Sequence, residues 1–374
     1  MIDMNRNEQL SSMALTLCPG IGHVGAKRLV EALGSATQVF ERRTEIPQLV
    51  PEAHQAVVDA LNCPEAFERA KRELEFVEKN NIACLTLNDE AYPSRLRECP
   101  DAPIALFFKG DCNLNALHVV SMVGTRRATQ YGKDFCDSFV RDLAQLCPDA
   151  LVVSGLAYGI DIHSHRASLA HGLPTVGVLA HGLDRIYPAV HRKTAVDMLQ
   201  RGGLLTEYLT ETNPDPYNFV SRNRIVAGMA DATLVVESAN KGGSLITADL
   251  ANGYNRDCFA LPGRSSDDAS AGCNKLIRDN KAALILSAED LVNAMGWQAA
   301  AAPKPDAIQR NLFLDLSPEE ERIVRTLQKQ GDMHINTLVM ETALPINRIS
   351  MLLFELEMKG VLKPLAGGVY HLLS

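Results

Sequence analysis

The stretch Leu151-Val-Val-Ser-Gly-Leu-Ala-Tyr-Gly-Ile-Asp161 joins a short apolar run to a glycine-containing turn and the acidic start of a helix. Similar apolar runs recur along the central part of the chain, most with a helical stretch between them. They cover residues 119–123, 175–179, 204–206, 234–236 and 258–261. Short apolar strands that alternate with helices predict an α/β fold, with a mostly parallel sheet covered by helices on both faces.

The flanking regions have a different character, and the chain of 374 residues is long enough for two or three domains. Residues 1–79 are helical in pattern and contain the turn Gly20-Ile21-Gly22, which predicts a helix-hairpin-helix domain. Residues 80–297 form the α/β core, and the alanine- and proline-rich residues 298–310 are typical of a linker. Residues 311–374 predict three helices and a hairpin, as in a winged helix.

Composition excludes several classes of protein. The longest apolar runs fall short of the roughly 20 residues of a membrane span, and the polar start lacks a secretory signal, so we expect a cytoplasmic protein. The nine cysteines form no C-x-x-C pair, which favours reduced thiols over disulfides. The net charge of −8 gives no general support for nucleic-acid binding. Such binding has to depend on particular residues.

Glycines and cations follow the ends of the predicted strands, where open parallel sheets bind their ligands. Three such loops resemble phosphate cradles, in which helix-start amides face an anion. Their candidate residues are Gly124 and Arg126, Ser154 and Gly155, and Lys241, Gly242, Gly243 and Ser244. We expect Arg126, Arg222, Arg224 and Lys241 to converge on one cationic groove. The alternative for any single loop is that its glycines only allow packing.

The triplet Arg222-Asn223-Arg224 precedes an apolar helical stretch. Guanidinium groups there are suited to bidentate phosphate binding. Alternatively, one arginine pairs with a buried carboxylate such as Glu207 and braces the site. We expect one arginine in each role, and the sequence leaves open which is which.

Signals for catalysis are weak. The chain has no G-x-x-x-x-G-K-[ST], no G-x-G-x-x-G after its first core strand and no G-x-S-x-G around Ser154. His163 and His165 are two residues apart and lack the spacing of a metal site. We therefore expect no enzyme activity, no cofactor and no metal.

These motifs together resemble the DNA-processing protein A family (DprA, also called Smf). The likeness covers roughly residues 80–295 and follows the family's order. It rests on Tyr92-Pro93, Gly124-Thr-Arg126, Ser154 to Asp161, Gly182-Leu-Asp184 with Tyr187-Pro188, Arg222 to Gly228, Gly243 to Thr247, and Pro262-Gly263. The terminal regions also look like accessory domains of this family.

The resemblance implies a Rossmann-like domain that binds single-stranded DNA, protects it and loads the RecA recombinase during natural transformation. It also implies a homodimer formed through that domain. By motif position, Arg126 holds a DNA phosphate, and Ser154, Gly155, Gly242, Gly243 and Ser244 offer amide or hydroxyl donors. Arg222, Asn223, Arg224 and Lys241 lie in or behind the same pocket.

The chain departs from the family pattern at two places, which suggests weaker or shifted DNA contacts. Residues 209–216 are acidic where relatives often carry a basic residue, and His191 stands where asparagine is more usual. Tyr217 and Phe219 are candidates for base stacking, with buried packing favoured for Phe219. Two other functions remain open: a nucleotide phosphoribohydrolase, although the glycine loop lacks that class's glutamate, and an adaptor that recruits partners through its accessory domains.

Overall fold

The computed structural model describes residues 2–50, 55–297, 316–365 and 368–373. The chain divides into two compact units, residues 1–301 and 302–374. The predicted linker, 298–310, lies outside the described residues. Across the described ranges, no helix is long and apolar enough to cross a membrane.

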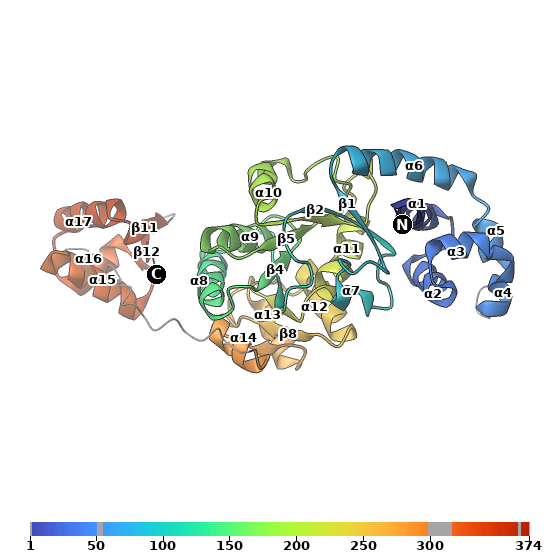
Figure 1. Cartoon of the computed structure of the whole chain (residues 1–374). Helices are drawn as coiled ribbons and strands as arrows, with labels where there is room; N and C mark the ends of the chain where they lie inside the picture. Colours follow the sequence, from blue (N-terminus) through green and yellow to red (C-terminus); the bar gives the residue numbers. More distant parts are fainter. Residues whose placement is uncertain (1, 51–54, 298–315, 366–367, 374) are drawn as a thin grey trace. The chain divides into compact units, whose positions relative to one another are not determined.

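The first unit is built on a mostly parallel sheet, as predicted (Figure 1). Within the described residues the strands follow the order β1-β2-β6-β5-β4-β3-β7-β8-β9, and only β1–β2 and β2–β6 pair antiparallel. The bounds are β1 Ala83–Thr86, β2 Ala105–Gly110, β3 Val119–Val123, β4 Leu151–Ser154, β5 Thr175–Val178, β6 Gly202–Thr206, β7 Ala232–Val235, β8 Asp257–Ala260 and β9 Ala283–Leu284. All six strands that the apolar runs of the central sequence predict are present.

Helices cover both faces of this sheet, because its central strands are apolar on both sides. In β3, Val120 and Met122 pack toward one helical layer, whereas Val119 and Val123 pack toward the other. The first layer contains α8 (Gln130–Leu146), α9 (Ile160–His171) and α14 (Ala288–Ala294). The second contains α11 (Pro216–Gly228), α12 (Gly243–Gly253) and α13 (Ala271–Arg278). The helix α10 (Arg192–Met198), preceded by the 3-10 turn η2 (Ala189–His191), packs beside α9.

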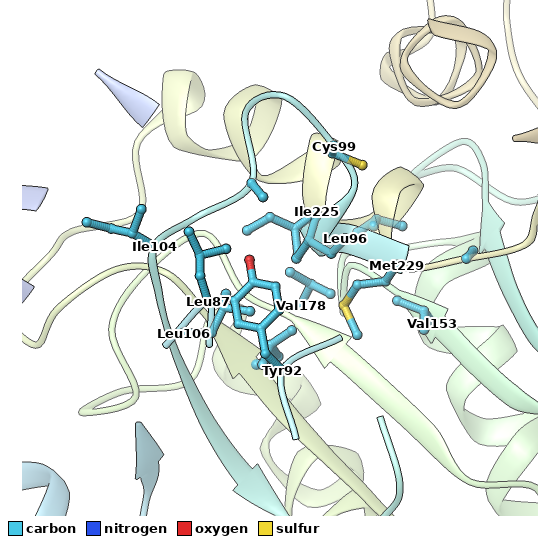
Figure 2. Packing of buried hydrophobic residues seen from close by; sticks show 14 of the residues in the cluster. Leu87, Tyr92, Leu96, Cys99, Ile104, Leu106, Val153, Val178, Ile225 and Met229 are labelled. Carbon is cyan, nitrogen blue, oxygen red and sulfur yellow. The ribbon is translucent and has the colours of Figure 1, made fainter. Parts of the chain in front are cut away.

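The segment before β3 fixes the position of α11. Tyr92 is fully buried and donates a hydrogen bond from its hydroxyl to the Pro103 carbonyl at 2.7 Å. Leu96, in the short helix α7 (Ser94–Arg97), also belongs to this buried cluster. Figure 2 shows these side chains packed against the sheet and against Ile225 and Met229. This packing buries the apolar face of α11. Another face of the helix can therefore line the site.

The amino-terminal helices share a core with the sheet. Met13 and Ala14 in the first helix and Leu74 in α6 pack with Cys84 of β1 and Phe107 of β2. The helices are α1 (Ile2–Leu17), α2 (His23–Leu33), α3 (Ala36–Glu41), η1 (Arg43–Glu45), α4 (Ile46–Leu49), α5 (Gln55–Ala60) and α6 (Pro64–Lys79). The helical region therefore belongs to the same compact unit as the α/β core.

The second unit has three helices and a small sheet, consistent with the expected winged helix. Its elements are α15 (Pro318–Gln330), β10 (Met333–His334), α16 (Ile335–Thr342), α17 (Ile346–Met358), β11 (Leu362–Leu365) and β12 (Val369–Leu372). Ser317 caps α15 in a capping box with Glu320, as the Ser-Pro-Glu-Glu sequence indicates. The third helix, α17, exposes the apolar residues Met351, Phe354 and Met358.

Candidate nucleic-acid interface

An open pocket of about 520 Å³ lies at the carboxyl ends of the central parallel strands. It is built from the loops after β3, β4, β5 and β7 and from one face of α11. Of the predicted site residues, the pocket is lined by Gly124, Arg126, Arg222, Asn223, Gly242, Gly243 and Ser244. Seven of the eleven predicted residues therefore meet at the edge of the sheet where the sequence placed them.

The start of α12 faces this pocket. Gly242 is the N-cap residue and offers no side chain to the first amides, so the helix begins without a side-chain cap. A Cβ on Gly242 would collide with the Ser238 hydroxyl, which itself accepts a hydrogen bond from the Ser244 hydroxyl at 2.9 Å. The Ser244 hydroxyl is thus engaged. The Leu245 amide donates to the Gly242 carbonyl at 3.1 Å, which leaves the Gly243 and Ser244 amides for an anion. An uncapped helix start favours negative charge.

Arg126 supplies an exposed cation to the same pocket. Its guanidinium lies 5.3 Å from the centroid of the Phe219 ring. Phe219 in turn packs against Tyr187, with 5.8 Å between ring centroids. Phe219 is therefore part of the pocket wall and only partly buried, so the prediction that it would pack in the interior was wrong. Tyr217 is exposed but does not line the pocket.

Arg222 forms part of the pocket floor. Its side chain is only 3% exposed, and Nη1 donates a hydrogen bond to the Val178 carbonyl at the end of β5. Its Nε has no hydrogen-bond partner among the described residues. Burial lowers the pKa of Arg222, and the nearby Asp161 carboxylate opposes that shift. Arg222 therefore contributes positive charge beneath the pocket, from a position where little water screens it.

The loop after β4 supports this floor, and two of its predicted donors are used internally. The buried Ser154 hydroxyl donates to the Met122 carbonyl at 2.5 Å, and the Gly155 amide donates to Asp161 at 3.1 Å. A Cβ on Gly155 would collide with the Arg222 guanidinium. The expectation that Ser154 and Gly155 offer donors to a ligand is therefore corrected. Ser154 instead ties the loop to β3, and Gly155 lets Arg222 and Asp161 approach closely.

Arg224 has the other role considered from the sequence. It is 5% exposed, donates from Nη2 to Glu207 and does not line the pocket. Burial raises the pKa of Glu207, and the charge of Arg224 opposes that shift. Arg222 thus faces the pocket while Arg224 pairs with the predicted carboxylate.

Lys241 is also corrected as a pocket residue. It lies exposed in the turn before Gly242 and does not line the pocket. The expected four-cation groove is therefore smaller than predicted: Arg126 and Arg222 line the pocket, and Lys241 lies next to one of its walls.

The pocket residues missing from the predicted site include Asp161, Tyr187 and Phe219. Asp161 could have been predicted from the sequence, because it is the acid that ends the stretch Leu151 to Asp161. Phe219 was visible by its spacing, because positions 219, 222 and 223 lie on one face of a helix. Gly159 was a further signal: its φ is +76°, and a Cβ there would collide with the Thr125 carbonyl, so the loops after β3 and β4 can touch.

The glycine hairpin near the amino terminus is a second uncapped helix start. Gly22 is the N-cap of α2 without a side-chain hydrogen bond. The adjacent hollow of about 130 Å³ is lined by glycines and apolar residues together with Arg28. Lys27, one turn into α2, is buried and pairs with Glu31 at 2.5 Å. Lys27 is thus turned to an internal partner.

Other chemistry has little support in the described ranges. No group of three or more potential metal ligands is found there. Burial raises the pKa of several cysteine thiols, such as Cys18 to about 11. These thiols are therefore poor nucleophiles.

Comparisons with known proteins identify the family. Residues 83–296 match the family model described as DNA recombination-mediator protein A, and residues 298–368 match that of the DprA winged helix domain. Protein Smf of Synechocystis is 30% identical over 408 residues, covering 98% of this chain and 100% of the relative.

Two solved structures agree with that match. DprA from Streptococcus pneumoniae is 30% identical, with a TM-score of 0.58 over 73% of this chain and 98% of that one. DprA from Helicobacter pylori, described for its unique single-stranded DNA binding mode, is also 30% identical, with a TM-score of 0.52 over 59% of this chain and 97% of that one. The family consists of recombination mediators, which favours a DNA-binding protein over the phosphoribohydrolase alternative. The chain belongs to the DNA recombination-mediator protein A (DprA/Smf) family.

Proposed function

We propose that this protein binds single-stranded DNA through the pocket at the carboxyl edge of its sheet. One observation carries the proposal: the exposed Arg126 and the uncapped start of α12 face the same open pocket. A phosphate between them receives a charged hydrogen bond from one side and helix-start amides from the other. The buried charge of Arg222 adds a favourable potential from below.

The pocket favours single strands because it offers rings as well as charge. Phe219 and Tyr187 line it together, and aromatic side chains stack on bases that are not paired in a duplex. The H. pylori relative, described for its single-stranded DNA binding mode, supports the same ligand. Because the whole chain carries a charge of −8, we expect the affinity to come from this local site.

The direct experiment compares single- and double-stranded oligonucleotides of one sequence, over a range of salt, by fluorescence anisotropy. The proposal predicts tighter binding to the single strand and affinity that falls steeply with salt. Arg126→Ala should weaken binding strongly, whereas Lys241→Ala should change it about twofold, since Lys241 lies outside the pocket. Equal affinity for both DNA forms, unchanged by Arg126→Ala, would refute the site.

Three further features follow from the family resemblance and belong to the same proposal. The protein loads RecA onto the bound strand in natural transformation or general recombination. It forms a homodimer through the Rossmann-like domain, and it works in the cytoplasm. A RecA pull-down from the full chain, repeated without residues 311–374, distinguishes this activity from an adaptor role of the winged helix. Sedimentation of the full chain tests the dimer.

We also propose that the chain works as the domains expected from its sequence. These are a helical domain at 1–79, the DNA-binding core at 80–297, a linker at 298–310 and the winged helix at 311–374. Limited proteolysis tests these boundaries, and cleavage within 298–310 should release two folded fragments. Resistance of that segment with early cleavage inside the core would contradict the division.

A further inference from the structure

We propose that the DNA path continues from the pocket onto a neighbouring strip of surface centred on Tyr158. We define the Tyr158 strip as Tyr158, Lys133, His163, Arg166 and Lys193. The inference deepens the proposed function and depends on it, because the ligand is the same single strand. It assigns a base-stacking role to Tyr158 and phosphate contacts to the cations around it.

The strip is continuous with the pocket along the chain. Ala157 lines the pocket, and Gly159 packs against the backbone of Thr125 and Arg126. Tyr158 lies between these two residues, and its side chain is 46% exposed. A DNA strand that runs from Arg126 toward this side of the pocket therefore reaches the Tyr158 ring.

The ring is held in place from behind. Its centroid is 5.0 Å from that of His191, in an edge-to-face arrangement. His191 is buried, and its Nδ1 is 2.9 Å from the Leu156 carbonyl. A half-exposed aromatic ring on a rigid support provides a stacking surface at low entropic cost. The departure at His191, which the sequence suggested would weaken DNA contact, thus supports a stacking position.

Three cations and His163 gather beside the ring on three neighbouring helices. Lys133 is in the first turn of α8, His163 and Arg166 are in α9, and Lys193 is in the first turn of α10. Figure 1 shows α9 packed between α8 and α10. All three helices follow parallel strands, so their starts lie on the same edge of the sheet as the pocket.

Two observations indicate that these charged side chains lie close to one another. Arg166 Nε lies 3.4 Å from the Thr194 hydroxyl, next to Lys193. Burial lowers the pKa of the half-buried His163, and the charges of Lys133, Arg166 and His191 lower it further. Because these charges all affect the His163 imidazole, their side chains lie near it.

On these three helices Lys and Arg equal Asp in number, five of each, but most of the aspartates have other partners. Asp134 accepts a hydrogen bond from Gln130, and Asp137 pairs with His171 at 2.9 Å. Asp197 is exposed on α10. Across the part of the chain that the structure describes, Lys133, Arg166 and Lys193 form no ion pair with a carboxylate. A phosphate can therefore approach them without displacing a carboxylate.

The experiment measures the affinity of the full chain for oligothymidylates of about 5 and about 20 nucleotides, lengths that bracket a short and an extended binding site. Tyr158→Ala should weaken binding of the long strand by about 5- to 100-fold and leave the short strand within twofold. Tyr158→Phe should retain wild-type affinity for both, because the ring is kept. Thermal unfolding checks that each variant is folded.

The cations are tested by salt dependence. Lys133→Gln with Arg166→Gln should lower the slope of log affinity against log salt by about 1.4 on the long strand, because two fewer phosphates are neutralised. Lys79→Gln with Lys275→Gln removes the same charge from exposed positions on α6 and α13 and should leave the slope unchanged.

The two proposals fail in distinguishable ways. If Arg126→Ala weakens both strands while the Tyr158 variants change neither, the pocket is correct and the Tyr158 strip is wrong. If the wild-type chain binds neither strand, the proposed function itself fails. Equal losses on short and long strands from Tyr158→Ala would place Tyr158 within the pocket and overturn the extension.

Discussion

The starts of α12 and α2 are alike in sequence and differ in what surrounds them. Each helix begins after a glycine N-cap that gives no side-chain hydrogen bond. The start of α12 opens into a pocket of about 520 Å³ that contains Arg126 and Arg222. The start of α2 borders a hollow of about 130 Å³, and the lysine one turn further on is buried against Glu31.

This difference shows what a glycine-rich helix start needs in order to bind phosphate. Backbone amides alone contribute a partial charge that salt screens easily. Cations that converge from other strands make the site stronger, and a parallel sheet collects them because its loops meet at one edge. At the start of α2, His23 instead lies beside Glu207, whose charge is already paired with Arg224. We therefore assign DNA binding to α12, and each variant below tests that contrast.

The largest expected effect is on stability, at the ion pair between Arg224 and Glu207. His23, at the start of α2, lies 3.5 Å from the same carboxylate, so this pair belongs to the hairpin side of the core. Arg224→Ala leaves a buried charge without its partner and should lower the free energy of unfolding by about 3–5 kcal/mol. Denaturant unfolding measures this loss. DNA affinity of the folded fraction should stay unchanged, and a selective loss of affinity with normal stability would place Arg224 in the site.

The next effect is on affinity, at Arg126. Removing this exposed guanidinium should weaken single-stranded DNA binding by about 10- to 100-fold, because a charged hydrogen bond to phosphate is lost. The matched variant is Arg28→Ala beside the α2 hairpin, which should change affinity less than twofold. Anisotropy titrations measure both. A larger effect from Arg28 would reverse the assignment of the two helix starts.

A pair of substitutions at the two helix starts sharpens the comparison. A Cβ on Gly243 or on Gly22 meets no atom within 4 Å, so aspartate fits at either position. Gly243→Asp places a carboxylate where the phosphate would bind and should weaken DNA binding by roughly 5- to 10-fold, while favouring the helix by a few tenths of a kcal/mol. Gly22→Asp should give the same small stabilisation with unchanged affinity. Equal losses of affinity would mean that both helix starts bind DNA.

The smallest effect is a pH dependence on the hairpin side. Burial, together with the charge of Arg224, lowers the pKa of His23 to about 4. The unfolded chain therefore takes up this proton first, so stability is complete above pH 6.5 and is lost as the pH falls toward 4. Because the ring is half-exposed, we expect a loss of about 1 kcal/mol. His23→Gln should remove this part of the pH dependence, and an unchanged profile would contradict it.

Much of the fold and of the site edge could be predicted from the sequence. Buried parallel strands appear in a sequence as continuous apolar runs. The glycines and cations follow those runs, so the strands and the loops of the site could both be predicted. The roles of Arg222 and Arg224 could not be separated. Residues two apart on a helix point about 200° away from each other, so one had to face inward. Only the packing of α11 against Tyr92 and Leu96 fixes which face is which.

The remaining misses have a similar cause. Ser154 and Gly155 lie in the correct loop, but the sequence does not show that Met122 and Asp161 use their donors. Lys241 lies exposed in the turn just before the Gly242 N-cap and does not line the pocket. These outcomes depend on the final turn geometry of each loop, which local pattern does not determine.

The most direct test of the central claim is the salt dependence of single-stranded DNA affinity for the wild-type chain and Arg126→Ala. The account predicts lower affinity for the variant at every salt concentration, with a slope of log affinity against log salt reduced by about 0.7, because one fewer phosphate is neutralised. Superimposable lines for the two proteins would contradict it, because DNA would then bind somewhere other than the pocket that Arg126 lines.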